Sequence, residues 1–326
     1  MNNYNENDLA IVSLCTNLGD SNALINPLTN NQYTIFAGQI YNSSLKSPKN
    51  LLDNIKDLDL YWQEFNLSFE MKNRIEYLLS PERVVKVHMG IQDLKRKNIH
   101  IITRASENYP VKLKDKLKNK RPSVIFYIGN LELIKVPSVG IVGSRNIGKE
   151  EELFINDVTL DLIYKSYTII SGGAKGADRT SEEVALNNNG NLVLFLASDM
   201  NKKITDPLII KHIIEGKMLI LSESVPSSHF KIYAAMDRNK YIYALSEFVI
   251  IAKTDYNKGG TWAGAREALK FKFSDVYLKD NKSNGFKALI DLGAYVYQEN
   301  NYNIKQKSST IKQLSLFEDN DIKSKL

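Results

Sequence analysis

The chain has 326 residues, a formal net charge of +6 and one cysteine, Cys15. This length is sufficient for two domains, and a single cysteine excludes a disulfide framework and a cysteine cluster for zinc. The four histidines are far apart, and no apolar run approaches the roughly 20 residues of a membrane-spanning helix. We therefore expect a cytoplasmic protein without a metal site or a membrane segment, and the positive charge mildly favours polyanionic partners.

Residues 1–97 are predicted to form a small helical accessory domain. Apolar residues recur at helical spacing in 51–58 and in 67–79. Ser80 followed by Pro81 indicates the start of another helix, which would run toward Lys97. This part contains no paired carboxylates and no nucleophile beside a base, so we expect no catalytic role for it.

Residues 98–298 alternate between short apolar runs and helical patterns. Strands are predicted at 99–103, 124–128, 138–142, 167–171, 191–197, 218–222, 248–253 and 275–278, and helices at 112–120, 149–162, 176–186, 206–214, 234–245, 263–270 and 285–292. Such alternation predicts an α/β fold in which helices cover both faces of a mainly parallel sheet. In sheets of this kind ligands bind beyond the carboxyl ends of the strands, where the strand order reverses.

Three glycine-rich loops follow predicted strands and would therefore lie at one edge of the sheet. They span 143–150, 171–178 and 258–262. Their basic residues are Arg145, Lys175 and Lys258. Glycines in one such loop could simply make a tight turn, but three loops with cations and helix N-termini favour an anionic ligand. Arg238 and Lys240, before the strand at 248–253, indicate either a solvated helix face or a further part of this edge.

The first loop nearly matches a phosphate-binding P-loop, but Glu150 stands where a hydroxyl would hold magnesium. The spacing of a dinucleotide fingerprint is also absent, and the second strand ends in Ser171 instead of the acid that would bind a ribose. The sequence therefore disfavours nucleotide hydrolysis and nicotinamide chemistry, and we expect no cofactor.

Five motifs in order resemble the DNA-processing protein A family (DprA, also called Smf). Residues 139–145 resemble its VAIVGSR, 171–178 its SGxAxGID, 219–223 its LLSE, 235–246 its FPxRNRxIAGLS and 259–269 its SGSLxTAxxAL. The resemblance covers about residues 99–296. It implies an extended Rossmann-like, doubly wound domain that binds single-stranded DNA without catalysis. It also implies a homodimer that helps to load a RecA-type recombinase during natural transformation.

The resemblance places the DNA-contacting arginine of the GSR motif at Arg145, and the RNR motif at 238–240. The full predicted DNA-binding set is Ser144, Arg145, Asn146, Ser171, Gly172, Gly173, Lys175, Arg238, Asn239, Lys240, Lys258, Gly259, Gly260 and Thr261. The sequence departs from the family pattern at Ala235, Met236, Asp237 and Glu182. These changes predict either a weakened or retuned contact with DNA or a divergent branch with another role.

Aromatic rings beside cations provide stacking surfaces for the bases of a single strand. Four rings near the loops are candidates for this role: Trp262, Tyr233, Phe230 and Tyr241. A position in the core or at the rim is the more common role for each of these rings. Trp262 is the preferred candidate because it lies inside a glycine-rich loop.

Residues 299–326 are polar and low in complexity, which predicts a disordered tail. One island interrupts it, at 313–317. Its residues Gln313, Leu314, Leu316 and Phe317 are similar to the peptide by which bacterial replication and repair proteins bind the sliding clamp. A fortuitous apolar patch is the alternative.

An enzyme is the main alternative to a DNA-binding protein. The loop at 258–267 resembles the PGGxGTxxE signature of nucleoside-monophosphate phosphoribohydrolases, the LOG-like group, but lacks the Gly-Thr pair and displaces the acid by one position. Such chemistry needs a carboxylate aimed at the sugar carbon, for which Asp178, Glu223 and Glu267 are the candidates. A nucleotide sensor that binds without turnover is a third alternative.

Overall fold

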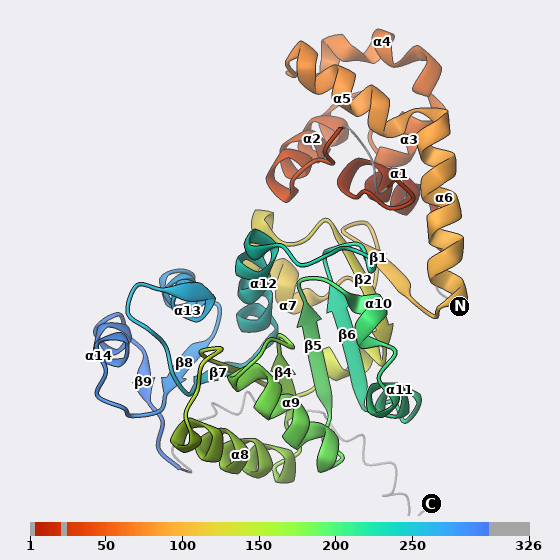
Figure 1. The fold of residues 1–326 in the computed structure, drawn as a ribbon. Coiled ribbons are helices and arrows are strands. Elements are labelled where there is room, and N and C mark those ends of the chain that lie inside the picture. The colour runs from red at the N-terminus through yellow and green to blue at the C-terminus, as the bar shows by residue number, and fades with distance from the viewer. Residues whose placement is uncertain (1–3, 21–24, 300–326) are drawn as a thin grey trace, which may run out of the picture.

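The computed structural model describes residues 4–20 and 25–299, and the tail peptide predicted to bind a sliding clamp lies outside them (Figure 1). The described part contains a nine-stranded sheet with the order β1-β2-β6-β5-β4-β3-β7-β8-β9. The strands are β1 (His100–Thr103), β2 (Val124–Gly129), β3 (Ser138–Val142), β4 (Thr168–Ser171), β5 (Leu192–Leu196), β6 (Met218–Ser222), β7 (Phe248–Ile251), β8 (Asp275–Leu278) and β9 (Tyr295–Val296). Strands β3 to β9 pair in parallel, whereas β1 and β2 are antiparallel additions at one edge.

The predicted α/β fold with a mainly parallel sheet is confirmed. Along β5, the side chains of Leu192 and Leu194 join one apolar core and those of Val193 and Phe195 join the other. Because side chains alternate along a strand, a fully apolar run is required where both faces of the sheet are covered. The final strand, β9, was not predicted, because two residues are too short to give a pattern.

Helices form a layer on each face of this sheet. One face carries α8 (Lys149–Tyr164), α9 (Ala177–Asn187) and α11 (Pro207–Ile214), and the other carries α7 (Val111–Leu117), α12 (Ile232–Leu245), α13 (Gly259–Phe271) and α14 (Asn284–Asp291). The short helix α10 (Met200–Lys203) follows β5 in the chain, and the 3-10 turns η3 (Lys118–Lys120) and η4 (Leu131–Ile134) precede and follow β2. None of the helices among the described residues is long and apolar enough to cross a membrane.

The N-terminal region forms a cap of helices above one end of the sheet (Figure 1). Its elements are α1 (Glu6–Cys15), α2 (Asn30–Asn42), α3 (Pro48–Asp53), η1 (Ile55–Asp57), α4 (Leu58–Tyr61), η2 (Trp62–Glu64), α5 (Phe69–Leu79) and α6 (Pro81–Arg96). Residues 51–58, in which helical spacing was noted, lie in α3, η1 and the start of α4, with a break at Asn54. There the Asn54 side chain donates to the carbonyl of Asn50 at 2.8 Å and so competes with the helical backbone.

The helical cap is joined to the sheet by continuous apolar packing. Ile11, Phe36 and Leu78 of the cap belong to the same buried cluster as Phe126 and Ile128 of β2. Helix α6 ends close to the expected boundary at residue 97, and β1 begins at His100. The division into two domains remains a prediction, and the packing shows that the cap is fixed to the sheet.

Candidate functional site

The strand order reverses between β3 and β7, and a cavity of about 380 Å³ opens beyond their carboxyl ends. Strands β3 to β6 follow one another outward on one side, and the chain then returns to place β7 on the other side of β3. The loops that follow β3 and β7 therefore diverge and leave a crevice. Its lining combines Ser144 and Arg145, which follow β3, with residues 258–261, which follow β7. Arg238 and Asn239 of α12 also line it.

A second cavity, of about 290 Å³, adjoins the first along the same edge of the sheet. We call this edge, at the carboxyl ends of the parallel strands, the rim. Gly172, Gly173 and Lys175 after β4 form one side of it, and Phe230 forms another. Arg145 and Arg238 line both cavities. The rim therefore presents two adjoining hollows with the same two arginines between them, which we call the first and second rim cavities.

Arg145 is the exposed cation of this pair. The carbon at the centre of its guanidinium lies 5.4 Å from the centroid of the Phe230 ring, which is 48% exposed. This distance is within the range of a cation–π contact, which holds a flexible arginine over the ring. A ligand at the rim would therefore meet a positive charge and an aromatic surface together.

Arg238 is the buried cation, with 6% of its surface exposed. Its Nη1 lies 3.6 Å from Oδ2 of Asp178, which is longer than a hydrogen bond. Its Nε and Nη1 have no hydrogen-bond partner among the described residues. Burial lowers the pKa of the Arg238 guanidinium and raises the pKa of the Asp178 carboxyl, yet arginine keeps its charge in proteins. A buried charge with unused donors points to an anionic ligand.

Glycine at position 172 is required by this arrangement. A Cβ atom there would lie 1.1 Å from Nη1 of Arg238, so any other residue would displace the guanidinium. On the opposite side of the first rim cavity, a Cβ at Gly260 would lie 2.5 Å from Nδ2 of Asn239. Thr261 fixes the two loops together, because its hydroxyl donates to the carbonyl of Gly143 at 2.8 Å.

Three residues of the predicted DNA-binding set lie outside both rim cavities. Ser171 is buried, and its hydroxyl donates to the carbonyl of Ile141 at 2.9 Å, which is a structural role. Asn146 is exposed at the edge of the first loop. Lys240 lies 3.1 Å from Oδ1 of Asp237 and faces a different space, described below.

The preferred stacking candidate was wrong. Trp262 is 6% exposed and packs edge-on against Tyr256, with 5.1 Å between the ring centroids. Tyr241 has no exposed surface and packs on Phe195. Phe230 alone of the described candidates offers a ring to solvent at the rim, and the side chain of Tyr233 lies outside the description.

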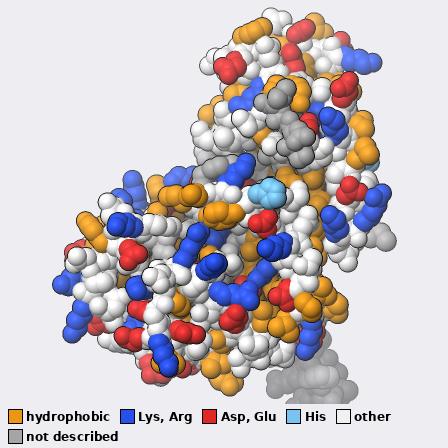
Figure 2. Space-filling view, in the orientation of Figure 1, with side chains coloured by type: hydrophobic (Ala, Val, Ile, Leu, Met, Phe, Trp, Pro, Cys, Tyr) orange, Lys and Arg blue, Asp and Glu red, His pale blue; other side chains and the backbone are white. Residues whose placement is uncertain are grey.

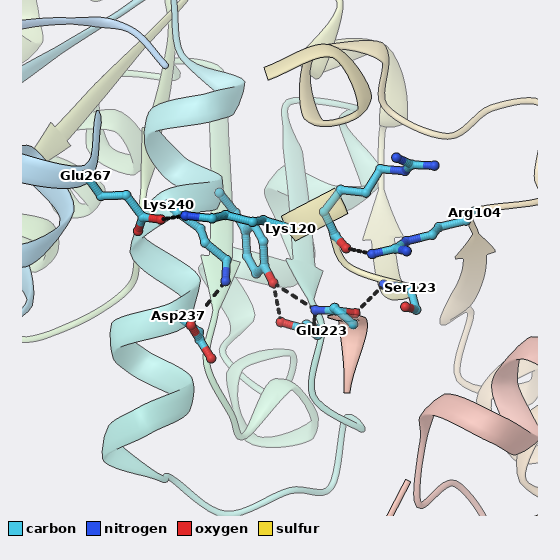
Figure 3. A network of polar contacts seen from close by, with 10 residues as sticks. Arg104, Lys120, Ser123, Glu223, Asp237, Lys240 and Glu267 are labelled. Atoms are coloured by element: carbon cyan, nitrogen blue, oxygen red, sulfur yellow. Dashed lines mark hydrogen bonds and ion pairs between the residues drawn. The ribbon is translucent and has the colours of Figure 1, made fainter. Parts of the chain in front are cut away.

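Glu223, after β6, is the centre of a polar network that joins the rim to the helical cap (Figure 3). Its carboxylate accepts from the Tyr241 hydroxyl at 2.5 Å and from the side-chain amide of Asn30, the first residue of α2. The amide oxygen of Asn30 in turn accepts from the backbone N–H of Ser123 at 2.7 Å. Burial of the carboxylate raises the pKa of Glu223.

Glu223→Gln is expected to change how stability depends on pH. A raised carboxyl pKa means that the folded state binds this proton more tightly than the unfolded state. The contribution of Glu223 to stability is therefore complete below its ordinary pKa of 4.5 and is lost as the pH rises through the higher folded-state value. Urea unfolding between pH about 4 and about 8 should show wild type losing stability relative to the variant as the pH rises. A difference that stays constant over this range would contradict the assignment.

A doubly wound sheet with a cationic, glycine-lined crevice at its switch point defines a Rossmann-like domain, a class of fold whose crevice suits phosphate-bearing ligands. The family model of DNA recombination-mediator protein A matches residues 100–307, and the chain belongs to this family. The chain is 30% identical over 185 residues to the DNA processing protein DprA of Streptococcus pneumoniae and 27% identical over 208 residues to that of Bacillus subtilis. These matches cover 53% and 61% of this chain, and 62% and 65% of the relatives, which is less than two thirds of their length.

The solved structures support the same fold. The X-ray structure of DNA processing protein A from Streptococcus pneumoniae superposes with a TM-score of 0.57 and 22% identity. The match covers 83% of this chain and 95% of that one. The alternation of strands and helices, together with the ordered motifs, was therefore sufficient to predict both the fold class and the family.

Proposed function

We propose that this chain binds single-stranded DNA along the rim of its sheet and does not cleave it. The observation that carries the proposal is the pair of rim cavities that share exposed Arg145 and buried Arg238. Two adjoining hollows suit consecutive units of a polymer better than one mononucleotide. The family description, a recombination mediator, and the names of the relatives, DNA processing proteins, support the same reading.

Single strands are held by cations that follow the phosphates and by rings on which bases stack. Lys175 and Lys258 are exposed on either side of Arg145, and Phe230 supplies the ring. Backbone groups of the glycine-rich loops can approach a phosphate closely, since no side chain intervenes. The rim thus offers both kinds of contact without selecting a base sequence.

The carboxylates considered for a phosphoribohydrolase already have partners. Asp178 faces Arg238, and Glu223 accepts from Asn30 and Tyr241. Glu267 lies 2.9 Å from Nζ of Lys120. A carboxylate that must attack or activate a reacting group needs to face the substrate, so these partnerships favour binding over catalysis.

Within this proposal, the bound strand is one taken up during natural transformation, and the protein helps to load a RecA-type recombinase on it as a homodimer. The family description as a recombination mediator supports this role. The peptide at 313–317 would add contact with a sliding clamp.

A salt titration of fluorescently labelled single-stranded DNA tests the proposal, with duplex DNA and nucleoside monophosphates as comparisons. Single strands should bind most tightly, and the logarithm of affinity should fall with that of salt by about 0.7 for each phosphate neutralised. Tighter binding of a mononucleotide than of the strand would contradict the proposal. Release of free base would identify an enzyme, and tight mononucleotide binding without release would identify a sensor.

A further inference from the structure

A third and larger cavity, of about 950 Å³, separates the helical cap from the rim, and we call it the cap cleft. The loop at 26–29, the start of α2 and Arg74 of α5 form its wall on the cap. The loop at 223–225 and α12 form the wall on the sheet, with η3 beside them. Figure 2 shows Lys and Arg side chains gathered over the rim, directly below the cap.

The cap cleft continues directly from the rim cavities. Arg238 lines all three spaces. Leu196 and Ala197 line both the second rim cavity and the cap cleft. A strand that passes over Arg145 and Phe230 can therefore enter the cleft without leaving the protein surface.

The two walls of the cap cleft are held in a fixed relation. Asn30 at the start of α2 donates to Glu223, which follows β6, and accepts from Ser123, which precedes β2. Helix α2 is therefore bonded to the ends of both strands. A guanidinium N–H of Arg104, after β1, donates to the hydroxyl of Thr34 in the same helix. Two of these bonds, Asn30 to Glu223 and Arg104 to Thr34, are part-buried and charge-assisted, which makes them stronger than bonds between neutral groups. The helical cap is thus positioned as a wall of the binding path.

The lining of the cap cleft suits nucleobases as well as phosphates. Side-chain amides line it at Asn31 and Gln32 at the start of α2 and at Asn119 in η3, which contacts α2. Amides both donate and accept, which matches the edges of unpaired bases. Three carboxylates also line the cleft. Those of Asp237 and Glu267 each form an ion pair with a lysine, at 3.1 Å and 2.9 Å, so their charges are balanced locally. The carboxylate of Glu223 accepts hydrogen bonds from Asn30 and Tyr241.

We infer that the cap cleft receives the nucleotides that follow those bound at the rim, with amide side chains of the helical cap contacting the base edges. This inference rests on the proposed binding of single-stranded DNA. It assigns the helical cap, in which the sequence showed no chemistry, a direct part in binding. It also makes the length of strand that the protein covers depend on the cap.

Oligothymidylates of graded length, from about 4 to about 20 nucleotides, test the inference. The test variant is Asn31→Glu, which adds a negative charge to the cleft in the first turn of α2, where the helix dipole favours an acid. The matched control is Gln63→Glu, which makes the same kind of change at an exposed residue of the cap outside all three cavities. Asn119→Glu, in η3 beside α2, is a second test variant.

Affinity of the wild type should rise with length beyond what the rim alone can hold. Asn31→Glu and Asn119→Glu should each weaken long strands by about fivefold, reduce the salt dependence by about one phosphate contact, and leave the shortest strands unchanged. Affinity that saturates at the shortest lengths, or test variants equal to Gln63→Glu on long strands, would overturn the inference while leaving rim binding intact. Failure of the wild type to bind at any length would overturn the proposed function as well.

Discussion

Arg145→Ala is expected to weaken the binding of single-stranded DNA by about 10- to 100-fold at about 0.1 M salt. Arg145 is exposed and lines both rim cavities, so one guanidinium can bind phosphates on either side. Its removal deletes a charge-assisted contact and the cation over Phe230. Because an exposed side chain contributes little to folding, the melting temperature should stay unchanged.

Arg266→Ala is the matched control for this experiment. Arg266 is exposed on α13 and lines none of the three cavities, so its removal lowers the net charge equally without touching the site. Fluorescence anisotropy with both variants separates a local contact from a general charge effect. Equal affinities for the two variants would remove Arg145 from the site.

The edge of the sheet that carries the site could be predicted from the sequence because of strand geometry. Apolar runs identified the parallel strands, and the carboxyl ends of parallel strands share one edge. Arg145 and Lys258, separated by more than a hundred positions, were therefore expected together and do line the same cavity. Their position at the same edge could be predicted without knowledge of side-chain packing.

The burial of Arg238 was not predicted, although the sequence carried a signal for it. Arg238 and Lys240 were interpreted as a solvated helix face or as a further part of the edge. Arg238 shares the spacing i, i+3, i+4, i+7 with buried Tyr241, Ile242 and Leu245, which places it on the inner face of α12. Helical period was a better guide to its environment than charge.

A shift in one helix boundary explains the error at Trp262. The helix predicted from residue 263 begins at Gly259. Trp262 therefore belongs to the first turn of α13 and faces inward with Ala265, instead of lying in an open loop. The contact between Asn30 and Glu223 could not be predicted at all, since no local pattern connects residues 193 positions apart.

Arg238→Gln is expected to lower both affinity for single-stranded DNA, by at least about tenfold, and the free energy of unfolding, by about 2 kcal/mol. The affinity falls because the cation that lines both rim cavities, with its unpartnered donors, is lost. The stability falls because Asp178 is left buried without its counter-charge. Burial already raises the pKa of Asp178, so protonation of this carboxyl limits the loss.

Adding Asp178→Asn to Arg238→Gln separates these two roles of the arginine. The double variant carries no buried charge at this position, so urea unfolding should show part of the lost stability restored. Binding should stay as weak as in the single variant, because an asparagine at 178 supplies no cation to a phosphate. If affinity recovers together with stability, Arg238 acts only by holding the fold, and the anionic ligand is bound by Arg145 and the loop backbone without it.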